Sequence, residues 1–399
     1  MKEITQKWLI LEDETLIDVV VGAFIANQLS TDPVWLLVIA PPSTAKTEIL
    51  TAVGRSEGAL LISGFTRATL VSGLPKKKGM KEPSLVTRIN GKTLVVKEFS
   101  SVLSMYSEEQ AQVLTQLREI YDGHLYRSFG NGKEVLFEGK AGLIGACTPA
   151  WDRHHAVVGS LGDRFILYRH HSPDPEAAGL KSLKEQFGHE KIMREELANI
   201  YSEFLGQFRP MPDFQFINND QVDFKISQLA TFCAHGRCTV ERDRYTQAIS
   251  YIPESEGPPR MAKQLKSLGV GVALAHGKNE IDDAVYSIIK RVGMDLIESR
   301  RTILLKYLWS ENLTEFVGWG TTRDIADACE LPATSAKYIL EDLQLAGLLN
   351  RRLKPSSGKD EEDEAGTGRK PYEWQIKQKA ENWIKASDVM DDSKGKVPF

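Results

Sequence analysis

The sequence predicts an α/β fold built on a parallel sheet, followed by an all-helical region and a C-terminal winged-helix unit. Apolar, strand-like segments alternate with helical patterns over residues 31–175, which is typical of a mostly parallel sheet with helices on both faces. From residue 182 to residue 289 the apolar residues recur at helical spacing. From about residue 294, three helical segments precede a two-stranded hairpin, which is the layout of a winged helix.

Length and composition set the bounds. A chain of 399 residues is long enough for two to three domains. Its 42% hydrophobic and 26% charged residues are typical of a globular protein. The net charge of −4 provides no overall basic field, so any nucleic-acid site must be local. The four cysteines are too few and too scattered for a disulfide framework. With no signal sequence and no apolar run of about 20 residues, we expect a cytoplasmic protein that makes no membrane contact.

Changes in composition divide the chain into five parts. We expect a helical lead-in, an α/β core, a helical second domain, a winged-helix domain and a C-terminal tail, at residues 1–30, 31–175, 176–293, 294–377 and 378–399.

The central motif is an apolar strand that ends in a short polar loop and restarts as a helix at Lys46. This is the order of a P-loop, in which loop N–H groups and the helix N-terminus face a phosphate. The lysine then reaches the outer phosphates, and the next hydroxyl, Thr47, holds Mg²⁺. Alanines stand where the pattern has glycines, at Ala40 and Ala45, so we expect φ of Ala45 to be negative. The predicted nucleotide-binding residues are Ala40, Pro41, Pro42, Ser43, Thr44, Ala45, Lys46 and Thr47.

Further elements follow in order. One or two helices are predicted over residues 8–29 and a long helix over 104–121, and a hairpin over 125–137 has its turn at 129–133. The remaining strands of the sheet are expected at 59–63, 93–99, 141–146 and 164–168. The strand at 93–99 ends with Glu98, where a nucleotide-hydrolysing enzyme would place a carboxylate for Mg²⁺ or for the attacking water.

A lysine-rich segment lies in the predicted loop over residues 73–83 and contains Lys76, Lys77, Lys78 and Lys81. A charge run of this kind fits either a solvated loop or a phosphate-contacting insertion. The sequence leaves both interpretations open.

In this order, the motifs resemble an AAA+ ATPase, and most closely the motor half of the minichromosome-maintenance (MCM) helicases. The resemblance extends from about residue 30 to residue 350. It implies a P-loop AAA+ core, an all-α lid and a C-terminal winged helix, with ATP and Mg²⁺ as cofactors. From this sequence we expect no counterpart of the DNA-encircling N-terminal domain of those helicases.

The resemblance also assigns roles to the ATPase residues. Lys46 and Thr47 match the Walker A lysine and hydroxyl, and Glu98 takes the water-polarising position, which leaves it and Thr47 to hold the metal. Lys97 stands where the Mg²⁺-binding aspartate belongs, and a lysine cannot ligate Mg²⁺. Thr148 matches the sensor-1 residue that orients the attacking water.

Three cationic residues complete the set. Arg164 matches an arginine finger that reaches the γ-phosphate bound by a neighbouring subunit. Arg260 takes the sensor-2 position. Lys133 matches the lysine of a hairpin that projects into a central pore, and it joins Lys76, Lys77 and Lys78 as a predicted nucleic-acid contact.

Three functions stay open. The first is an ATP-driven, ring-forming DNA helicase or translocase from a phage or mobile element. The resemblance implies a homo-oligomer in the form of a hexameric ring. It would act on single- or double-stranded DNA with a replication or element-encoded protein partner. The second is an AAA+ protein remodeller, which the acidic tip of the predicted wing favours. The third is a nucleotide-gated DNA-binding regulator with weak ATPase activity, which Lys97 favours.

Overall fold

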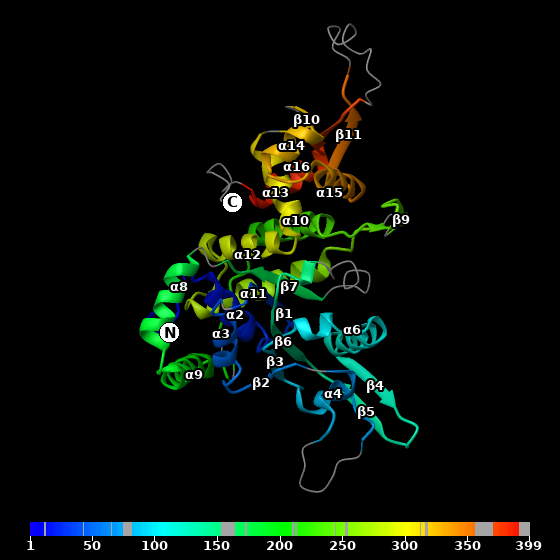
Figure 1. Cartoon of the computed structure of the whole chain (residues 1–399). Coiled ribbons are helices and arrows are strands. Elements are labelled where there is room, and N and C mark those ends of the chain that lie inside the picture. The colour runs from blue at the N-terminus through cyan, green and yellow to red at the C-terminus, as the bar shows by residue number, and fades with distance from the viewer. Residues whose placement is uncertain are drawn as a thin grey trace. The chain divides into compact units, whose positions relative to one another are not determined.

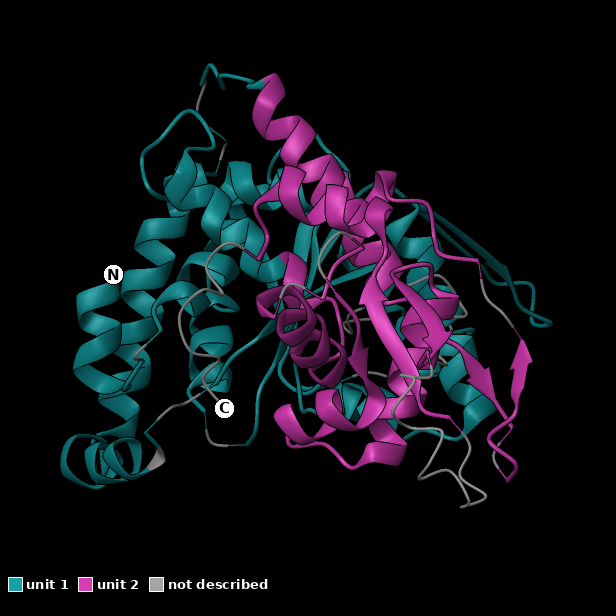
Figure 2. Ribbon diagram, turned by 90° about the horizontal axis from the view of Figure 1, so that it is seen from above, with its two compact units in different colours: residues 1–219, 263–292 teal, residues 220–262, 293–399 magenta. Residues whose placement is uncertain are grey.

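The computed structural model describes most of the chain and divides it into two units. The description excludes residues 12, 43, 65, 75–81, 153–163, 172–173, 210, 212–213, 244, 252–253, 312, 316–317, 356–369 and 391–399. The first unit contains residues 1–219 and 263–292, and the second contains residues 220–262 and 293–399 (Figure 2). The predicted helical domain, residues 176–293, therefore contributes to both units.

A five-stranded parallel sheet forms the centre of the first unit (Figure 1). Its strands lie in the order β2-β3-β6-β1-β7. Every residue of β1 is buried, as expected for a parallel strand covered on both faces. The strand bounds are Trp35–Ile39 (β1), Ala59–Ile62 (β2), Lys92–Val96 (β3), Ala141–Cys147 (β6) and Phe165–Arg169 (β7).

Helices cover both faces of this sheet. Figure 1 shows α2 (Thr15–Ala26) and α3 (Lys46–Val53) on one side and α6 (Ser107–Tyr121) on the other. Eleven of the twelve residues of α2 are buried, because this helix is apolar around its whole circumference. The other helices that lie wholly or mainly in the first unit are α1 (Lys2–Trp8), α4 (Arg67–Leu70), η1 (Leu85–Arg88), α5 (Ser100–Leu103), α8 (Pro175–Lys181), η2 (Ser182–Gln186), α9 (Glu190–Gly206), α11 (Pro259–Ala275) and α12 (Asp283–Asp295).

The predicted hairpin is confirmed as β4 (His124–Ser128) and β5 (Glu134–Glu138). Leu125 pairs with Phe137, and side chains of β5 alternate between exposed and buried. This alternation is the pattern of a strand with one face on the core.

The second unit contains helices and a small antiparallel sheet. Its elements are α10 (Asp220–Gly236), β8 (Glu241–Arg242), β9 (Ile249–Tyr251), α13 (Ser299–Ser310), β10 (Gly320–Thr321), α14 (Thr322–Ala328), α15 (Ala333–Leu345), β11 (Leu349–Leu353), β12 (Tyr372–Ile376) and α16 (Gln378–Ser387). The strands β10, β12 and β11 form one sheet in that order. The predicted succession of three helices and a hairpin is thus present.

Two predictions for this unit are corrected. The region from 182 to 289 was expected to be helical throughout, but β8 and β9 pair there. The carboxylate of Asp243 accepts hydrogen bonds from the N–H groups of Tyr245 (3.0 Å) and Thr246 (2.7 Å), and this turn competes with a helix. The first residues of the predicted tail form α16, because Trp383 and its apolar neighbours on that helix are buried.

None of the described helices is both long enough and apolar enough to cross a membrane.

Candidate active site

The loop after β1 leads from the sheet into α3. The N–H of Ala40 donates to the carbonyl of Cys147 (3.1 Å), which keeps Ala40 in the sheet and buried. Pro41 and Pro42 are exposed. The helix begins at Lys46, and the predicted phosphate contact at Ser43 lies outside the described residues.

The backbone of Ala45 differs from the prediction. Its φ is +53° and its ψ is −22°, so the expectation of a negative φ is wrong. Turning the chain from the loop into the first turn of α3 requires this conformation, which suits glycine and strains an L-residue with a Cβ.

Lys46 is buried beside this loop, with 4% of its surface exposed. Its Nζ donates to the carbonyl of Pro41 (2.6 Å), and the hydroxyl of Thr44 donates to the same carbonyl (2.8 Å). Burial lowers the pKa of the Lys46 amine, and the negative charge of Glu98 opposes that shift. An ammonium has three donors, so a phosphate that entered the loop would offer Lys46 stronger acceptors than one carbonyl.

The carboxyl ends of three strands meet at the edge of the sheet where Lys46 lies. Glu98 follows β3, Thr148 follows β6, and the loop follows β1. Because β6 lies between β3 and β1, the ends of β3 and β1 are separated by two strand spacings, or about 10 Å. Glu98 is exposed at this edge.

Ser100 connects Glu98 with Thr148, and its role was not predicted from the sequence. Its N–H donates to Oε1 of Glu98 (3.0 Å), and its Oγ accepts from the N–H of Thr148 (3.0 Å). The same Oγ lies 3.2 Å from Oγ1 of Thr148 and 3.5 Å from Sγ of Cys147. Burial raises the pKa of Cys147 to about 11, so this thiol stays protonated. The signal available in the sequence was a hydroxyl two positions after a strand-ending carboxylate.

The residues at this edge are compatible with Mg²⁺ only when a nucleotide contributes ligands. Among the described residues, no three His, Cys, Asp or Glu side chains group where they could hold a metal ion. Thr47 is exposed at the start of α3, and Lys97 is half-buried beside Glu98. Mg²⁺ in phosphate sites keeps several waters and takes one or two protein ligands plus phosphate oxygens. A hydroxyl from Thr47 and a carboxylate from Glu98 meet that requirement.

Arg164 lies at the other edge of the sheet. It precedes Phe165, which pairs with Trp35 at the start of β1, whereas the loop follows the end of β1. Five strand residues at about 3.3 Å each separate the two edges by roughly 17 Å. Arg164 Nη2 donates to both carboxylate oxygens of Asp122 (3.0 and 3.2 Å). Arg164 is therefore too far away to reach a phosphate held by the Lys46 of its own chain.

The last predicted catalytic residue, Arg260, lies in the first turn of α11 and belongs to the second unit. The structure does not bring it together with Lys46, Glu98 and Thr148 within one unit.

A partly buried polar cluster lies in the first unit near the end of β7. Asp13 accepts a hydrogen bond from the hydroxyl of Tyr168 (2.8 Å) and forms an ion pair with Arg291. Burial opposes ionisation of Asp13, but bonds from Thr15 and Tyr168 and the charge of Arg291 lower its pKa to about 2. His170 donates its N–H to the carbonyl of Ile39 (2.9 Å). Burial lowers the pKa of His170 to about 4, so its ring is neutral at pH 7.

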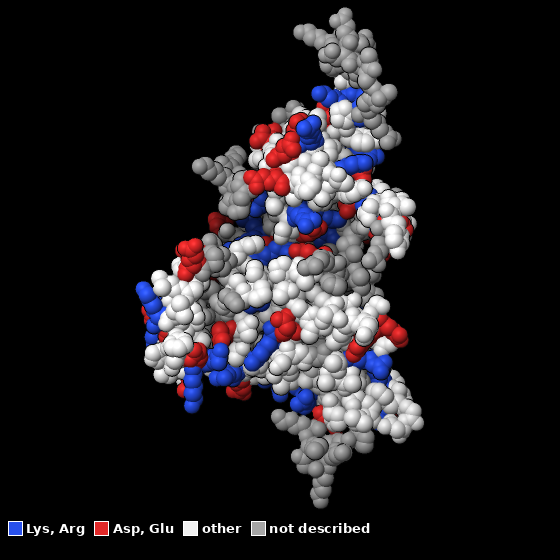
Figure 3. Space-filling model, viewed as in Figure 1, with Lys and Arg blue, Asp and Glu red and all other residues white. Residues whose placement is uncertain are grey.

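The predicted nucleic-acid residues separate into two groups. Lys133 is described and lies at the turn of the β4–β5 hairpin, where it forms an ion pair with Glu82 (2.7 Å). The predicted contacts at Lys76, Lys77 and Lys78 lie outside the described residues. Basic and acidic side chains are interspersed over the face shown in Figure 3, which agrees with the net charge of −4.

Comparison with models of protein families found no matching family. Comparison with curated proteins found no match either.

Proposed function

We propose that this protein is an ATP-hydrolysing P-loop enzyme of the AAA+ type that moves along DNA. The observation that carries the proposal is the meeting of Lys46, Thr148 and Glu98 at one edge of a parallel sheet. Ligands of open α/β sheets bind beyond the carboxyl ends of the strands. Across that edge, the negative charge of Glu98 favours the charged form of the Lys46 amine.

The chemistry follows from this arrangement. Phosphoryl transfer needs positioned charge around the γ-phosphate and a directed water rather than covalent participation by the protein. Lys46 neutralises phosphate charge, and the hydroxyl of Thr47 holds the Mg²⁺ that comes with ATP. Glu98 accepts a proton from the attacking water, and Thr148 orients that water.

A second subunit completes the site. Arg164 is roughly 17 Å from the phosphate-binding edge of its own chain, and its guanidinium is fixed by Asp122 (3.0 Å). In keeping with the resemblance to an arginine finger, we propose that Arg164 leaves Asp122 and acts on a phosphate bound by a neighbouring copy of the chain. The active form is therefore a homo-oligomer, and a closed hexameric ring of the MCM type gives every site such a neighbour.

Two parts of the chain support DNA as the substrate. The lysine-rich segment at 76–81 contains four lysines and provides the local positive charge that the net charge of −4 does not. In the second unit, the winged-helix succession from α13 to β12 includes exposed arginines on β11, and Arg351 lies over the ring of Tyr372 (4.7 Å). The hairpin suits a single strand, and the wing suits duplex DNA or a replication partner.

The test compares ATP binding with ATP turnover. Lys46→Ala should abolish nucleotide binding, whereas Glu98→Gln should retain ATP and accumulate an ATP-bound oligomer. Lys92→Ala is the matched control, because Lys92 begins β3 at the opposite edge of the sheet. Wild-type hydrolysis by the Glu98→Gln variant would refute the catalytic assignment. Electron microscopy with an ATP analogue and single-stranded DNA should show rings with a strand in the pore.

Lys97 favours a second candidate, a nucleotide-gated DNA-binding regulator with weak ATPase activity. It occupies the position of a metal-binding carboxylate but brings a positive charge, which offsets phosphate charge without coordinating Mg²⁺. In that case ATP should drive oligomer formation at a concentration where turnover is barely measurable. Rapid, DNA-stimulated turnover would exclude the regulator.

A further inference from the structure

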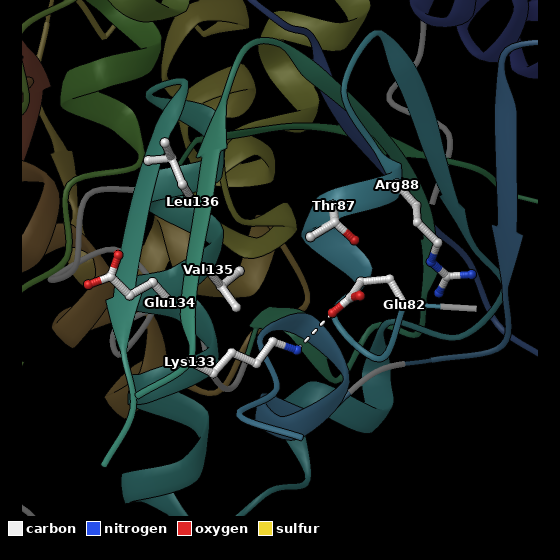
Figure 4. Close-up of a pocket in the computed structure, with 7 residues that line it drawn as sticks. All are labelled: Glu82, Thr87, Arg88, Lys133, Glu134, Val135 and Leu136. Atoms are coloured by element: carbon white, nitrogen blue, oxygen red, sulfur yellow. Dashed lines mark hydrogen bonds and ion pairs between the residues drawn. The ribbon is translucent and has the colours of Figure 1, made fainter. Parts of the chain in front are cut away.

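The turn of the β4–β5 hairpin is bound to two short stretches that are eight residues apart in the sequence. Lys133 Nζ donates to the carbonyl of Leu74 (2.6 Å) and forms an ion pair with Glu82 (2.7 Å). The side-chain amide of Asn131 donates to the carbonyl of Gly73 (2.7 Å). We call these five residues the hairpin junction; Figure 4 shows Lys133 directed toward Glu82.

A second set of contacts holds the same two stretches, around residues 73 and 83, against each other. The N–H of Ser72 donates to Oγ of Ser84 (3.0 Å), and that hydroxyl donates to the carbonyl of Ser72 (3.2 Å). Both serines are buried. The ring of Phe129 packs against Gly73 so closely that a Cβ there would lie 2.7 Å from it. The hairpin turn and the residues around 73 and 83 therefore form one packed unit.

The burial and pairing of Lys133 and Glu82 bear on whether Lys133 binds a phosphate. A cavity of about 650 Å³ is lined by Glu82, Thr87, Arg88, Lys133, Glu134, Val135 and Leu136. Only about a fifth of the Lys133 side chain and a quarter of the Glu82 side chain are exposed. Glu134 is bonded to the hydroxyl of Tyr126 (2.8 Å) and points away from Lys133 (Figure 4). A phosphate that drew the Lys133 ammonium away from Glu82 would leave that carboxylate half-buried without its partner, and such a loss is costly.

We propose that Lys133 is a positioning residue that holds Leu74 and Glu82 against the hairpin, and that it is not a direct phosphate ligand. The proposal rests on the proposed function, because it concerns how the hairpin region takes a single-stranded nucleic-acid backbone. Loss of Lys133 weakens that binding through the junction. The junction therefore depends on the carboxylate of Glu82 and the amide of Asn131 as well as on the lysine.

The decisive measurement is the sign of the effect of Glu82→Gln on binding of fluorescent oligo(dT) by the full-length protein with an ATP analogue. If Lys133 positions the junction, Glu82→Gln lowers the affinity as Lys133→Ala does, by about threefold for a part-exposed ion pair. If Lys133 binds phosphate directly, Glu82→Gln removes a competing carboxylate and raises the affinity. An increase would overturn the proposal.

Two further variants separate the junction from general charge. Asn131→Ala removes no charge but breaks the bond to Gly73, so it should also lower the affinity. Arg127→Ala is the matched control, because Arg127 lies on the same hairpin but pairs with Glu119 (2.9 Å) outside the junction. An equal loss for Arg127→Ala and Lys133→Ala, with none for Asn131→Ala, would contradict positioning.

Hydrogen exchange without nucleic acid tests the junction independently of the proposed function. Peptides covering residues 70–74 and 82–89 should exchange faster in Lys133→Ala, Glu82→Gln and Asn131→Ala, and at the wild-type rate in Arg127→Ala. Unchanged exchange in the first three would overturn the proposal. If the wild-type protein binds no oligo(dT), the DNA part of the proposed function fails while the exchange result still decides the role of Lys133.

Discussion

Replacing Ala45 by glycine should stabilise the protein, although glycine within a helix is usually less stable than alanine. Ala45 has a φ of +53° and a ψ of −22°, immediately before α3. Its backbone is therefore held in a conformation that L-residues, which carry a Cβ, rarely adopt. Glycine adopts the same backbone without that steric cost.

The magnitude can be worked from two opposing contributions. A left-handed backbone costs an L-residue about 1–2 kcal/mol in the folded state. Glycine adds conformational entropy to the unfolded chain, which costs about 0.4–1 kcal/mol. The difference is a net stabilisation of about 0.5–1 kcal/mol.

The other alanine at a glycine position provides the matched control. Ala40 is 1% exposed and continues β1 by bonding to Cys147 (3.1 Å). Ala40→Gly loses a buried methyl and gains unfolded-state entropy, so it should destabilise by about 1–2 kcal/mol. The two Ala→Gly changes should thus have opposite signs.

Native-state hydrogen exchange at the amides of β1 is the appropriate assay, because it reports opening of the first unit alone. A single melting temperature would mix the two units. Destabilisation by Ala45→Gly, alongside the expected loss for Ala40→Gly, would refute the strain argument.

Three further predictions concern the site. Mixing Arg164→Ala subunits with Lys46→Ala subunits should restore some ATPase activity, because a mixed interface combines an intact loop with an intact arginine; no recovery in confirmed mixed oligomers would contradict action in trans. Lys97→Asp should raise ATP turnover if the lysine only weakens Mg²⁺ binding, and complete loss of turnover would show an adapted role. His170→Phe should reduce the loss of stability on acidification. The unfolded imidazole takes up a proton near pH 6.5, whereas the buried, folded one does so only near pH 4. The free energy of unfolding of the wild type therefore falls by about 3 kcal/mol as the pH drops through that window. Native-state hydrogen exchange at the amides of β7, measured from pH 7 to pH 4 and corrected for intrinsic exchange rates, gives that difference for the first unit alone; equal slopes for both proteins would contradict it.

The sequence predicted the secondary structure of the first unit closely. Strands β2, β3, β6 and β7 and the β4–β5 hairpin all lie within a few residues of their predicted ranges. These segments were predictable because apolar runs and alternating patterns are local signals. The β8–β9 hairpin was missed because its strands are two and three residues long, which is too short for a periodicity to emerge.

The candidate site was predictable only in part. The positions of Lys46, Glu98 and Thr148 at strand ends could be read from the chain, since parallel strands bring such ends to one edge. The role of Ser100 could not be predicted, because its hydrogen bond with Thr148 (3.0 Å) joins residues that are 48 apart in the sequence. The role of Lys133 was likewise hidden, since Glu82 is 51 residues away.

The amino-acid sequence by itself determined the order of strands, helices and hairpin, because hydrophobic periodicity is set by residues a few positions apart. It also determined that the net charge of −4 provides no overall attraction for DNA, so any such contact must be local. Only the tertiary structure decided that Ala45 takes a positive φ, that Arg164 lies at the opposite edge of the sheet from Lys46, and which carboxylate pairs with Lys133. Those three outcomes depend on strand order and on packing between distant segments, which no local pattern encodes.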